Sequence, residues 1–386
     1  MRALHVFSNW KWTGPAELAL NACRGLNAIG VEARFACGRA GPERMGTVRE
    51  HAIEQGLEPV LPILTLSKHF RLFANLSDAR RLRAYVAAEA IDIVHAHLPN
   101  DHAIAARALG RRAGVRLVRT SYDGERLPRT LRMRLALRAT DALIVVSRAA
   151  FLDARAGLGF PEDRIFFVEA PIDTHRFDPA RRLADLRPRL GLAEGDFAFG
   201  IVARMQRHRR FDVFLEAVRR AAARAPHLKA VVIGRGTHQE AVAREPARSL
   251  GISDRVLFPG YLEGEDYVAA LAAIDAKVFL VPGSDGSCRA VREAMSMGKP
   301  VIAARRGMLP EIVSDGRTGL LVDDEPEPLA GAMLRLALDR SLSRAMGEAA
   351  RNEARERFSI ERAAKALEGV YEATLARPRA LSGRAS

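Results

Sequence analysis

The strongest constraint on the fold is an alternation of short apolar runs with amphipathic helical patterns, which occurs twice along the chain. The runs have the length and β-branched content of buried parallel strands. They lie at residues 3–7, 32–37, 92–96, 115–120, 141–146 and 164–168, and again at 197–203, 229–233, 255–258, 277–281, 300–304 and 319–322. Strands that alternate with helices predict an α/β protein with two doubly wound parallel sheets. Two such sheets that face each other leave a cleft at the carboxyl ends of their strands, where ligands bind in this class.

Breaks in the alternation indicate the domain boundaries. Residues 177–195 are polar and contain proline, so they are the best linker candidate. The N-terminal domain would then cover 1–176 and the C-terminal domain 196–357. Residues 358–376 form a helical pattern with one apolar face, which predicts a helix that docks on the rest of the protein. Its apolar residues are Leu367, Val370, Tyr371 and Leu375. We expect the tail 377–386 to be disordered.

The composition excludes several classes of protein. With 48% hydrophobic and 27% charged residues, the chain can build cores, which excludes a disordered or fibrous protein. Cys23, Cys37 and Cys288 lie too far apart for a zinc ribbon or a disulfide framework, as is typical of a reducing cytosol. No stretch approaches the roughly 18 apolar residues that cross a bilayer, and the apolar run after Arg2 is too short for a signal peptide. We therefore expect a soluble, cytoplasmic protein.

The net charge of +14 suggests an anionic partner. Only six of the 60 basic residues are lysine and the arginines are scattered, which is typical of a GC-rich genome and argues against nucleic acid. An anionic membrane surface fits the charge better than nucleic acid does, and residues 66–86 combine apolar and basic side chains that could lie on such a surface. These are Phe70, Leu72, Phe73 and Leu76 with Lys68, Arg71, Arg80, Arg81 and Arg83. The alternative is an ordinary helix that covers the sheet and keeps its arginines in water.

The most informative segment is 281–322, VPGSDGSCRAVREAMSMGKPVIAARRGMLPEIVSDGRTGLLV. It resembles the nucleotide-sugar site of family-4 glycosyltransferases, which carry two glutamates separated by seven residues, with glycine after the first. Glu293 matches the second glutamate, and Asp285, followed by Gly286, stands at the first. The match continues through Ala294, Met295, Gly298, Lys299, Pro300 and Val301, and then through Pro310, Glu311, Asp315, Gly316, Thr318 and Gly319. The resemblance covers nearly the whole chain in outline. It implies two facing Rossmann-like domains of GT-B type, the first on the acceptor side and the second holding the nucleotide sugar.

The chemistry of the segment agrees with this resemblance. A carboxylate such as Glu293 can accept hydrogen bonds from both hydroxyls of a ribose, and a helix that begins near Arg289 would direct its amino end at a diphosphate. The alternative is that Glu293 is a solvated helix residue. The resemblance implies a catalytic role for Asp285 on the donor sugar. It implies a donor-binding set of Glu293, Gly286, Ser287, Cys288 and Arg289, together with Gly14 and Gly234.

Two arginines follow the first strand of the second domain. Family members have an arginine at the position of Arg204 and a lysine at that of Arg209. Two fixed cations at the carboxyl end of a strand can neutralise a departing diphosphate, so we expect both to be catalytic. The alternative is solvated arginines in an arginine-rich chain. No Asp-x-Asp occurs in the chain, so the metal-nucleotide device of the other main glycosyltransferase fold is missing. We expect no metal and no cofactor.

The acceptor-side candidates lie in the first domain. The loop 10–15 resembles a glycine-rich family loop that closes over donor phosphate and acceptor, although only Gly14 of the usual glycine pair is present. His97 resembles a family position at the cleft, and Tyr122, beside Asp123, stands where some relatives carry a histidine. We expect His95 and His97, at alternate positions, to point to opposite faces, so that one is a core residue and the two share no metal.

Taken together, the resemblance implies a retaining, metal-independent glycosyltransferase of the hexosyltransferase kind. It would move a sugar from a nucleotide diphosphate to an acceptor hydroxyl, in envelope glycolipid or polysaccharide synthesis at the inner face of the membrane. Two alternatives stay open. One is a nucleotide-sugar epimerase, which shares the architecture. The other is a non-catalytic protein that binds a nucleotide sugar or an anionic surface, which the departures at Asp285, Arg209 and Tyr122 suggest.

Overall fold

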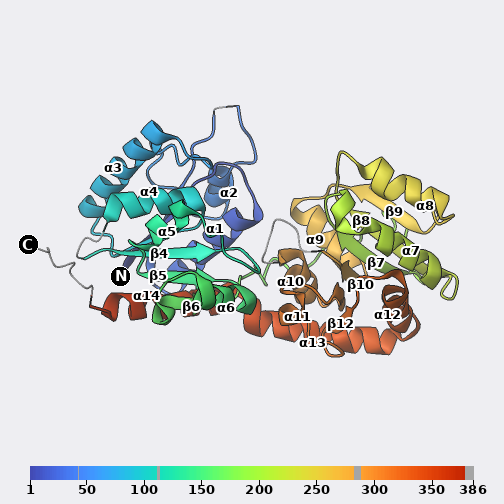
Figure 1. Ribbon diagram of the computed structural model, residues 1–386. Coiled ribbons are helices and arrows are strands. Elements are labelled where there is room, and N and C mark those ends of the chain that lie inside the picture. Colours follow the sequence, from blue (N-terminus) through green and yellow to red (C-terminus); the bar gives the residue numbers. More distant parts are fainter. Residues whose placement is uncertain (42, 111–113, 282–287, 379–386) are drawn as a thin grey trace, which may run out of the picture. The chain divides into compact units, whose positions relative to one another are not determined.

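The computed structural model describes residues 1–41, 43–110, 114–281 and 288–378 (Figure 1). The chain divides into two compact units, the first made of Met1–Ile172 with Ile360–Ser386 and the second of Asp173–Ser359. Each unit contains a six-stranded sheet in which all neighbouring strands run parallel. The predicted α/β class with two doubly wound sheets is confirmed.

The sheet of the first unit has the strand order β2-β1-β3-β4-β5-β6. Its strands are β1 (Arg2–Phe7), β2 (Glu32–Cys37), β3 (Ile93–Ala96), β4 (Arg116–Ser121), β5 (Ala142–Val145) and β6 (Ile165–Phe167). The connecting helices are α1 (Gly14–Ala28), α2 (Val48–Glu54), α3 (Leu72–Ala88), α4 (Pro99–Leu109), α5 (Leu131–Leu137), α6 (Arg148–Gly157) and the 3-10 turn η1 (Glu162–Arg164). The order reverses at β1, and ligands of doubly wound sheets bind at the carboxyl ends beside such a reversal.

The C-terminal helix α14 (Ile360–Ala376) belongs to the first unit and packs against α1. Leu367, Val370 and Tyr371 are buried in the same core as α1, so the predicted docking of this helix is confirmed. The helices approach closely at Gly25, where an added Cβ would lie 2.7 Å from Ile360 Cγ2. Residues 379–386 of the predicted tail lie outside the described residues.

The sheet of the second unit has the order β12-β11-β10-β7-β8-β9 and reverses at β7. Its strands are β7 (Phe197–Val202), β8 (Leu228–Ile233), β9 (Val256–Gly260), β10 (Ala276–Phe279), β11 (Val301–Ala304) and β12 (Gly319–Val322). Its helices are α7 (Phe211–Ala222), α8 (Glu245–Ser249), α9 (Gly264–Ala273), α10 (Arg289–Ser296), α11 (Leu309–Ile312), α12 (Pro326–Leu338) and α13 (Arg340–Phe358), with the short turns η2 (Arg207–Arg209) and η3 (Glu240–Arg244). All strands of both units lie within two residues of their predicted ends.

The segment 177–195, which the sequence suggested as a linker, lies inside the second unit. Its apolar side chains Phe177, Leu186, Leu190 and Leu192 are buried in one cluster with residues of α9. The structure therefore divides the chain at 172/173 and at 359/360. Four buried side chains are enough to attach a segment whose average composition is polar.

Candidate functional site

A pocket of about 210 Å³ lies at the carboxyl ends of β7 and β8 in the second unit. Arg204 and Gly234 line it together, with Arg235 and Tyr261 beside them. Gly234 has a φ of 144°, and a Cβ on it would collide with the carbonyl oxygen of Ala203. Only glycine allows the two strand ends to approach in this way. The structure thus brings together two residues that the sequence suggested from separate motifs.

Arg209 lies in η2, half-buried, close to the same strand end. Its Nη1 donates to the carbonyl oxygen of Val281 at 3.2 Å. Burial lowers the pKa of Arg209, the positive charge of Arg204 lowers it further, and Cys288 opposes this. The two arginines and Cys288 therefore share one electrostatic environment. Arg204 is exposed, whereas Arg209 is held in place by its burial and its backbone contact.

Cys288 and Arg289 begin the helix that carries Glu293. Cys288 is buried and caps α10 in a left-handed conformation with φ 49°. Arg289 is the first residue of α10, and its Nε lies 3.2 Å from Glu293 Oε1. Asp285, Gly286 and Ser287 lie outside the described residues.

Glu293 is not a solvated helix residue, because only 2% of it is exposed. The hydroxyl of Tyr267, from α9, donates to Glu293 Oε2 at 2.5 Å. With Arg289 on the other oxygen, the carboxylate is held from two sides. Its orientation is therefore fixed before any ligand arrives. Tyr267 was not suggested by the sequence, since nothing in its helix indicates which way it points.

Lys277 is a second residue that the sequence did not suggest. It lies on β10, is fully buried, and its Nζ has no hydrogen-bond partner among the residues that the structure describes. Burial lowers the pKa of Lys277 to about 7, and the charge of Glu293 opposes this shift. A lysine in an otherwise apolar strand was the available signal, because unpaired lysines are rarely buried.

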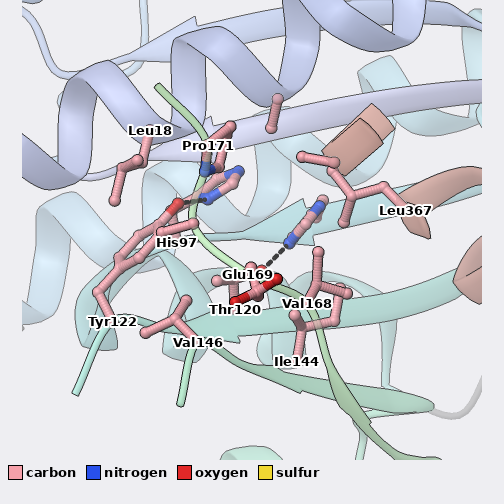
Figure 2. A pocket seen from close by; sticks show the side chains of 14 residues that line it. Leu18, His97, Thr120, Tyr122, Ile144, Val146, Val168, Glu169, Pro171 and Leu367 are labelled. Carbon is pink, nitrogen blue, oxygen red and sulfur yellow. Dashed lines mark hydrogen bonds between the residues drawn. The ribbon is translucent and has the colours of Figure 1, made fainter. Parts of the chain in front are cut away.

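In the first unit, His97 and Tyr122 lie together at the ends of β3 and β4. The Nδ1 atom of His97 and the hydroxyl of Tyr122 are 2.7 Å apart, and both side chains line a cavity (Figure 2). Asp123 accepts a hydrogen bond from the Ser121 hydroxyl at 2.5 Å. Gly14, also predicted, is the first residue of α1 in this unit.

The expectation that His95 and His97 point to opposite faces is wrong. Side chains two residues apart in a strand share a face, and these two rings stack with their centroids 4.3 Å apart. His5, on the neighbouring strand β1 and in register with His95, joins them. All three are buried, and each offers a ligand atom within 4.8 Å of the others, so this group could hold a metal ion.

A buried arginine interacts electrostatically with this cluster. Arg119 on β4 is 3% exposed, and its Nε and Nη1 have no hydrogen-bond partner in the described part of the chain. Burial lowers its pKa, while Asp101 and Asp123 oppose the shift. Asp101 accepts backbone hydrogen bonds from Ser8, His97 and Leu98, and burial raises its pKa to about 6. Two buried ionisable groups that interact electrostatically thus lie near the ends of β1, β3 and β4.

The comparisons with known proteins define the class. Residues 12–176 match the family model "Glycosyltransferase Family 4", and residues 184–353 match "Glycosyl transferases group 1". The structure of Anabaena Alr3699/HepE in complex with UDP superposes with a TM-score of 0.75 at 19% identity, over 96% of this chain and 100% of that one. The chain thus has the GT-B architecture of two Rossmann-like units.

Curated relatives identify the family. The GDP-mannose-dependent alpha-(1-6)-phosphatidylinositol monomannoside mannosyltransferase of Mycolicibacterium smegmatis is 30% identical over 285 residues, which is 69% of this chain and 73% of the relative. The D-inositol 3-phosphate glycosyltransferase of Corynebacterium jeikeium is 34% identical over 242 residues, 60% of this chain, and the match spans only 57% of that relative. This chain belongs to glycosyltransferase family 4. Among the described residues, no helix combines the length and apolar character needed to span a membrane.

Proposed function

We propose that this protein is a retaining, metal-independent glycosyltransferase that moves a sugar from a nucleotide diphosphate to an acceptor hydroxyl. The observation that carries the proposal is Glu293, a buried carboxylate held by Tyr267 and Arg289. Burying a charged carboxylate costs free energy unless polar groups bind it, so a carboxylate at this depth indicates a polar binding site. A carboxylate can accept hydrogen bonds from both hydroxyls of a ribose.

The second element of the proposal is the pair of cations near β7. Arg204 and Arg209 would neutralise the diphosphate as it leaves, which is the role a metal has in other glycosyltransferases. In the reaction, the bond between the sugar C1 and the diphosphate oxygen breaks. The acceptor oxygen bonds to C1 on the same face, and its proton passes to the departing diphosphate. This step needs no enzyme nucleophile and no metal, and Asp285 would contact the donor sugar.

The relatives support a donor and an acceptor class. One is named as a user of GDP-mannose that acts on a phosphatidylinositol monomannoside, another as acting on inositol 3-phosphate, and the structural neighbour was solved with UDP. We propose a nucleotide-diphosphate hexose as donor and a polyol or glycolipid headgroup of the cell envelope as acceptor. His97, Tyr122 and Asp123 would lie on the acceptor side.

We also propose that the enzyme works in the cytoplasm, against the anionic inner face of the membrane. Phe73 of α3 is 83% exposed, and it lines a groove with Arg80, Arg83 and Arg107. Exposed apolar side chains with a basic rim are typical of surfaces that bind anionic lipid. Leu131 and Leu135 of α5 are exposed as well, and Arg132 of that helix lies 4.3 Å above the ring of Phe70.

A panel of nucleotide sugars tests the proposal. The protein is first screened for thermal stabilisation by UDP-, GDP- and ADP-sugars, and the best ligand is then followed by NMR with inositol phosphates and lipid acceptors. We expect donor hydrolysis without acceptor, transfer with it, and the same anomeric configuration in product and donor. Inversion would refute retention. Conversion of the free donor to its epimer would favour an epimerase, and binding without any turnover would favour a non-catalytic protein.

A further inference from the structure

A buried series of hydrogen bonds runs across the first sheet and connects its strands β1, β3 and β4 with helix α14. It consists of three imidazoles and three hydroxyls, here called the histidine chain. In order, its bonds join Thr120 Oγ1 to His95 Nε2 (2.7 Å), His95 Nδ1 to Tyr371 Oη (2.7 Å), Tyr371 Oη to His5 Nε2 (3.2 Å), His5 Nδ1 to His97 Nε2 (3.0 Å) and His97 Nδ1 to Tyr122 Oη (2.7 Å). We infer that the histidine chain has one common direction of donation, and that Tyr371 is a positioning residue that sets the direction of the Tyr122 hydroxyl.

The burial and the hydrogen-bond geometry of the three imidazoles favour their neutral form. His5, His95 and His97 are fully or almost fully buried, and among the residues that the structure describes none of their hydrogen bonds goes to a carboxylate. Burial lowers the pKa of His5 to about 3 and moves those of His95 and His97 in the same direction, with the charge of Arg119 adding to the effect for the latter two. A neutral imidazole has one N–H donor and one acceptor nitrogen, so each ring donates one hydrogen bond and accepts one.

The order of the atoms then dictates the tautomers. In every ring of the histidine chain, Nε2 bonds the neighbour on the Thr120 side and Nδ1 bonds the neighbour on the Tyr122 side. If donation runs from Thr120 to Tyr122, all three rings carry their proton on Nδ1. If donation runs the other way, all three carry it on Nε2. Neighbouring groups cannot choose independently, because two donors or two acceptors facing each other leave a bond unmade.

One mixed arrangement has to be excluded. Tyr371 could accept from His95 and His5 at once, since a phenol oxygen has two lone pairs. Its own proton would then have no acceptor, because these two rings are the only hydrogen-bond partners of this hydroxyl in the described part of the chain. Tyr371 is fully buried, and burial raises its pKa well above the usual value. The phenol therefore keeps its proton and must donate it, which makes the direction uniform.

Both ends of the histidine chain open into the same cavity. Thr120 and Tyr122 line it beside Val146, Glu169 and Leu367 (Figure 2). When donation runs toward Tyr122, that hydroxyl is free to donate into the cavity, and Thr120 is free to accept. When donation is reversed, the two ends exchange these roles. A hydroxyl group or a water in the cavity fits either state, because it both donates and accepts.

This inference rests on the proposed function for one step only, the placing of Tyr122 on the acceptor side. Tyr371 is more than two hundred residues from Tyr122 in sequence, yet only two imidazoles separate their hydroxyls in the chain. Removing the Tyr371 hydroxyl would divide the histidine chain into two parts. The hydroxyls of Tyr122 and Thr120 could then both donate into the cavity, or both accept from it. The C-terminal helix thereby acts on the acceptor side without touching the substrate.

The first test needs no activity. In protein labelled with ¹⁵N-histidine, two-bond ¹H–¹⁵N spectra distinguish Nδ1–H, Nε2–H and doubly protonated rings. We expect His5, His95 and His97 to be neutral between pH 6 and pH 8 (around the usual histidine pKa) and to share one tautomer. Two different tautomers among the three, or an imidazolium in this range, would overturn the common direction.

The same sample decides between the histidine chain and a metal centre. Zinc or cobalt bound by the purified protein at one ion per chain, and lost in His5→Gln, would overturn the inference in favour of a three-histidine metal site. We expect no such stoichiometric metal, and no shift of the three ring signals when EDTA is added.

The second test measures the acceptor. Tyr371→Phe keeps the ring and removes only the hydroxyl. We expect the KM for the acceptor to rise about tenfold, the effect of a buried hydrogen bond left unmade, while donor hydrolysis without acceptor stays unchanged. Tyr85→Phe is the matched control, because its hydroxyl bonds Arg34 in the same unit, outside the histidine chain.

The outcomes distinguish failure of the positioning role of Tyr371 from failure of the proposed glycosyltransferase function. A folded Tyr371→Phe variant with an unchanged acceptor KM would overturn the positioning role, even if the tautomers are uniform. If the wild-type protein neither hydrolyses nor transfers any donor, the proposed function fails, and the tautomer spectra still decide whether the histidine chain exists.

Discussion

At the scale of single residues, Glu293 carries the clearest prediction. Its carboxylate is buried and held by Tyr267 and Arg289, so a ribose would meet acceptors that are already oriented. Glu293→Gln removes the charge but keeps the shape. We expect nucleotide affinity to fall by roughly 1.5–3 kcal/mol, about 10- to 150-fold, as measured by calorimetry with the best-binding nucleotide.

The matched control for Glu293 is Glu353→Gln. Glu353 is also a buried carboxylate of the second unit, paired with Arg317 and Arg357. Its loss should lower thermal stability and leave nucleotide affinity unchanged. An equal loss of affinity in both variants would mean that Glu293 acts only through the fold.

Arg204 is expected to act on turnover more than on binding. It lines the pocket at the ends of β7 and β8 and is exposed to an incoming ligand. Negative charge on the diphosphate grows as the bond to the sugar breaks, so a cation there favours the transition state over the ground state. We expect Arg204→Ala to lower kcat by about 10²-fold or more, as for other groups that stabilise developing charge.

Steady-state kinetics in parallel with donor binding tests this role of Arg204. Arg207→Ala is the control, because Arg207 is a nearby exposed arginine of η2. A deficit in Arg204→Ala that appears only as a raised KM would contradict transition-state stabilisation.

At the scale of elements, the contact between α1 and α14 leaves no room for an added side chain at Gly25. A Cβ on Gly25 would lie 2.7 Å from Ile360 Cγ2 and 3.0 Å from Ala364 Cβ. We expect Gly25→Ala to destabilise the protein by about 1–3 kcal/mol, the usual cost of overpacking, which thermal unfolding would detect as a lower Tm.

The control for Gly25 lies on α14 itself. An added Cβ on Gly369 meets nothing within 4 Å. Gly369→Ala should therefore stabilise the helix by up to about 1 kcal/mol through helix propensity. If both variants lowered the Tm equally, the close approach of the helices would not be the cause.

Helix α3 is the element that decides the membrane proposal. Asn75 and Asp78 interrupt its apolar pattern because they are buried and make hydrogen bonds to the rest of the unit. Phe73 stays exposed, and Arg80 lies near it at the rim of the same groove. We expect the protein to sediment with vesicles, increasingly with phosphatidylglycerol content and less at high salt.

The variant for this test follows from the structure. Arg81 and Arg83 donate to backbone carbonyls of Ile63, Arg107 and Ala108, so their replacement would disturb the fold. Phe73→Ser with Arg80→Gln removes only exposed groups and should abolish most vesicle binding. Equal recovery with neutral and anionic vesicles for the wild-type protein would leave α3 as an ordinary covering helix.

At the scale of the whole molecule, the proposed chemistry depends on charges that the chain itself supplies. Since Arg204 and Arg209 share one environment near β7, we expect transfer to be unchanged after exhaustive dialysis against EDTA. Activity is compared before and after dialysis and again with added Mg²⁺ or Mn²⁺. A strict requirement for either ion would contradict the metal-independent mechanism.

The fold was largely predictable because strand signals are local. A buried parallel strand is a short β-branched run, visible without knowing its neighbours, and the predicted runs lie within two residues of the observed ends. Residues 177–195 show the limit of such signals, because their average polarity hides the four side chains that pack against α9.

The candidate site was predictable only where a motif is continuous in sequence. One such motif is α10, which contains Arg289 and Glu293 and is preceded by Cys288. Another is the segment after β7, which contains Arg204 and Arg209. Tyr267 bonds Glu293 from α9, and Lys277 on β10 interacts with it electrostatically; no local pattern indicates either interaction.

The sequence by itself determined the alternation of strands and helices, the family and the continuous motifs, because these depend on residues a few positions apart. Only the tertiary structure decided that His5 lies beside His95, since strand register is set by packing across the sheet. It also decided that Tyr371, near the end of the chain, completes a hydrogen-bond network begun on β1. Buried polar groups must find partners wherever the fold places them, and the distance between those partners along the chain has no bearing on the choice.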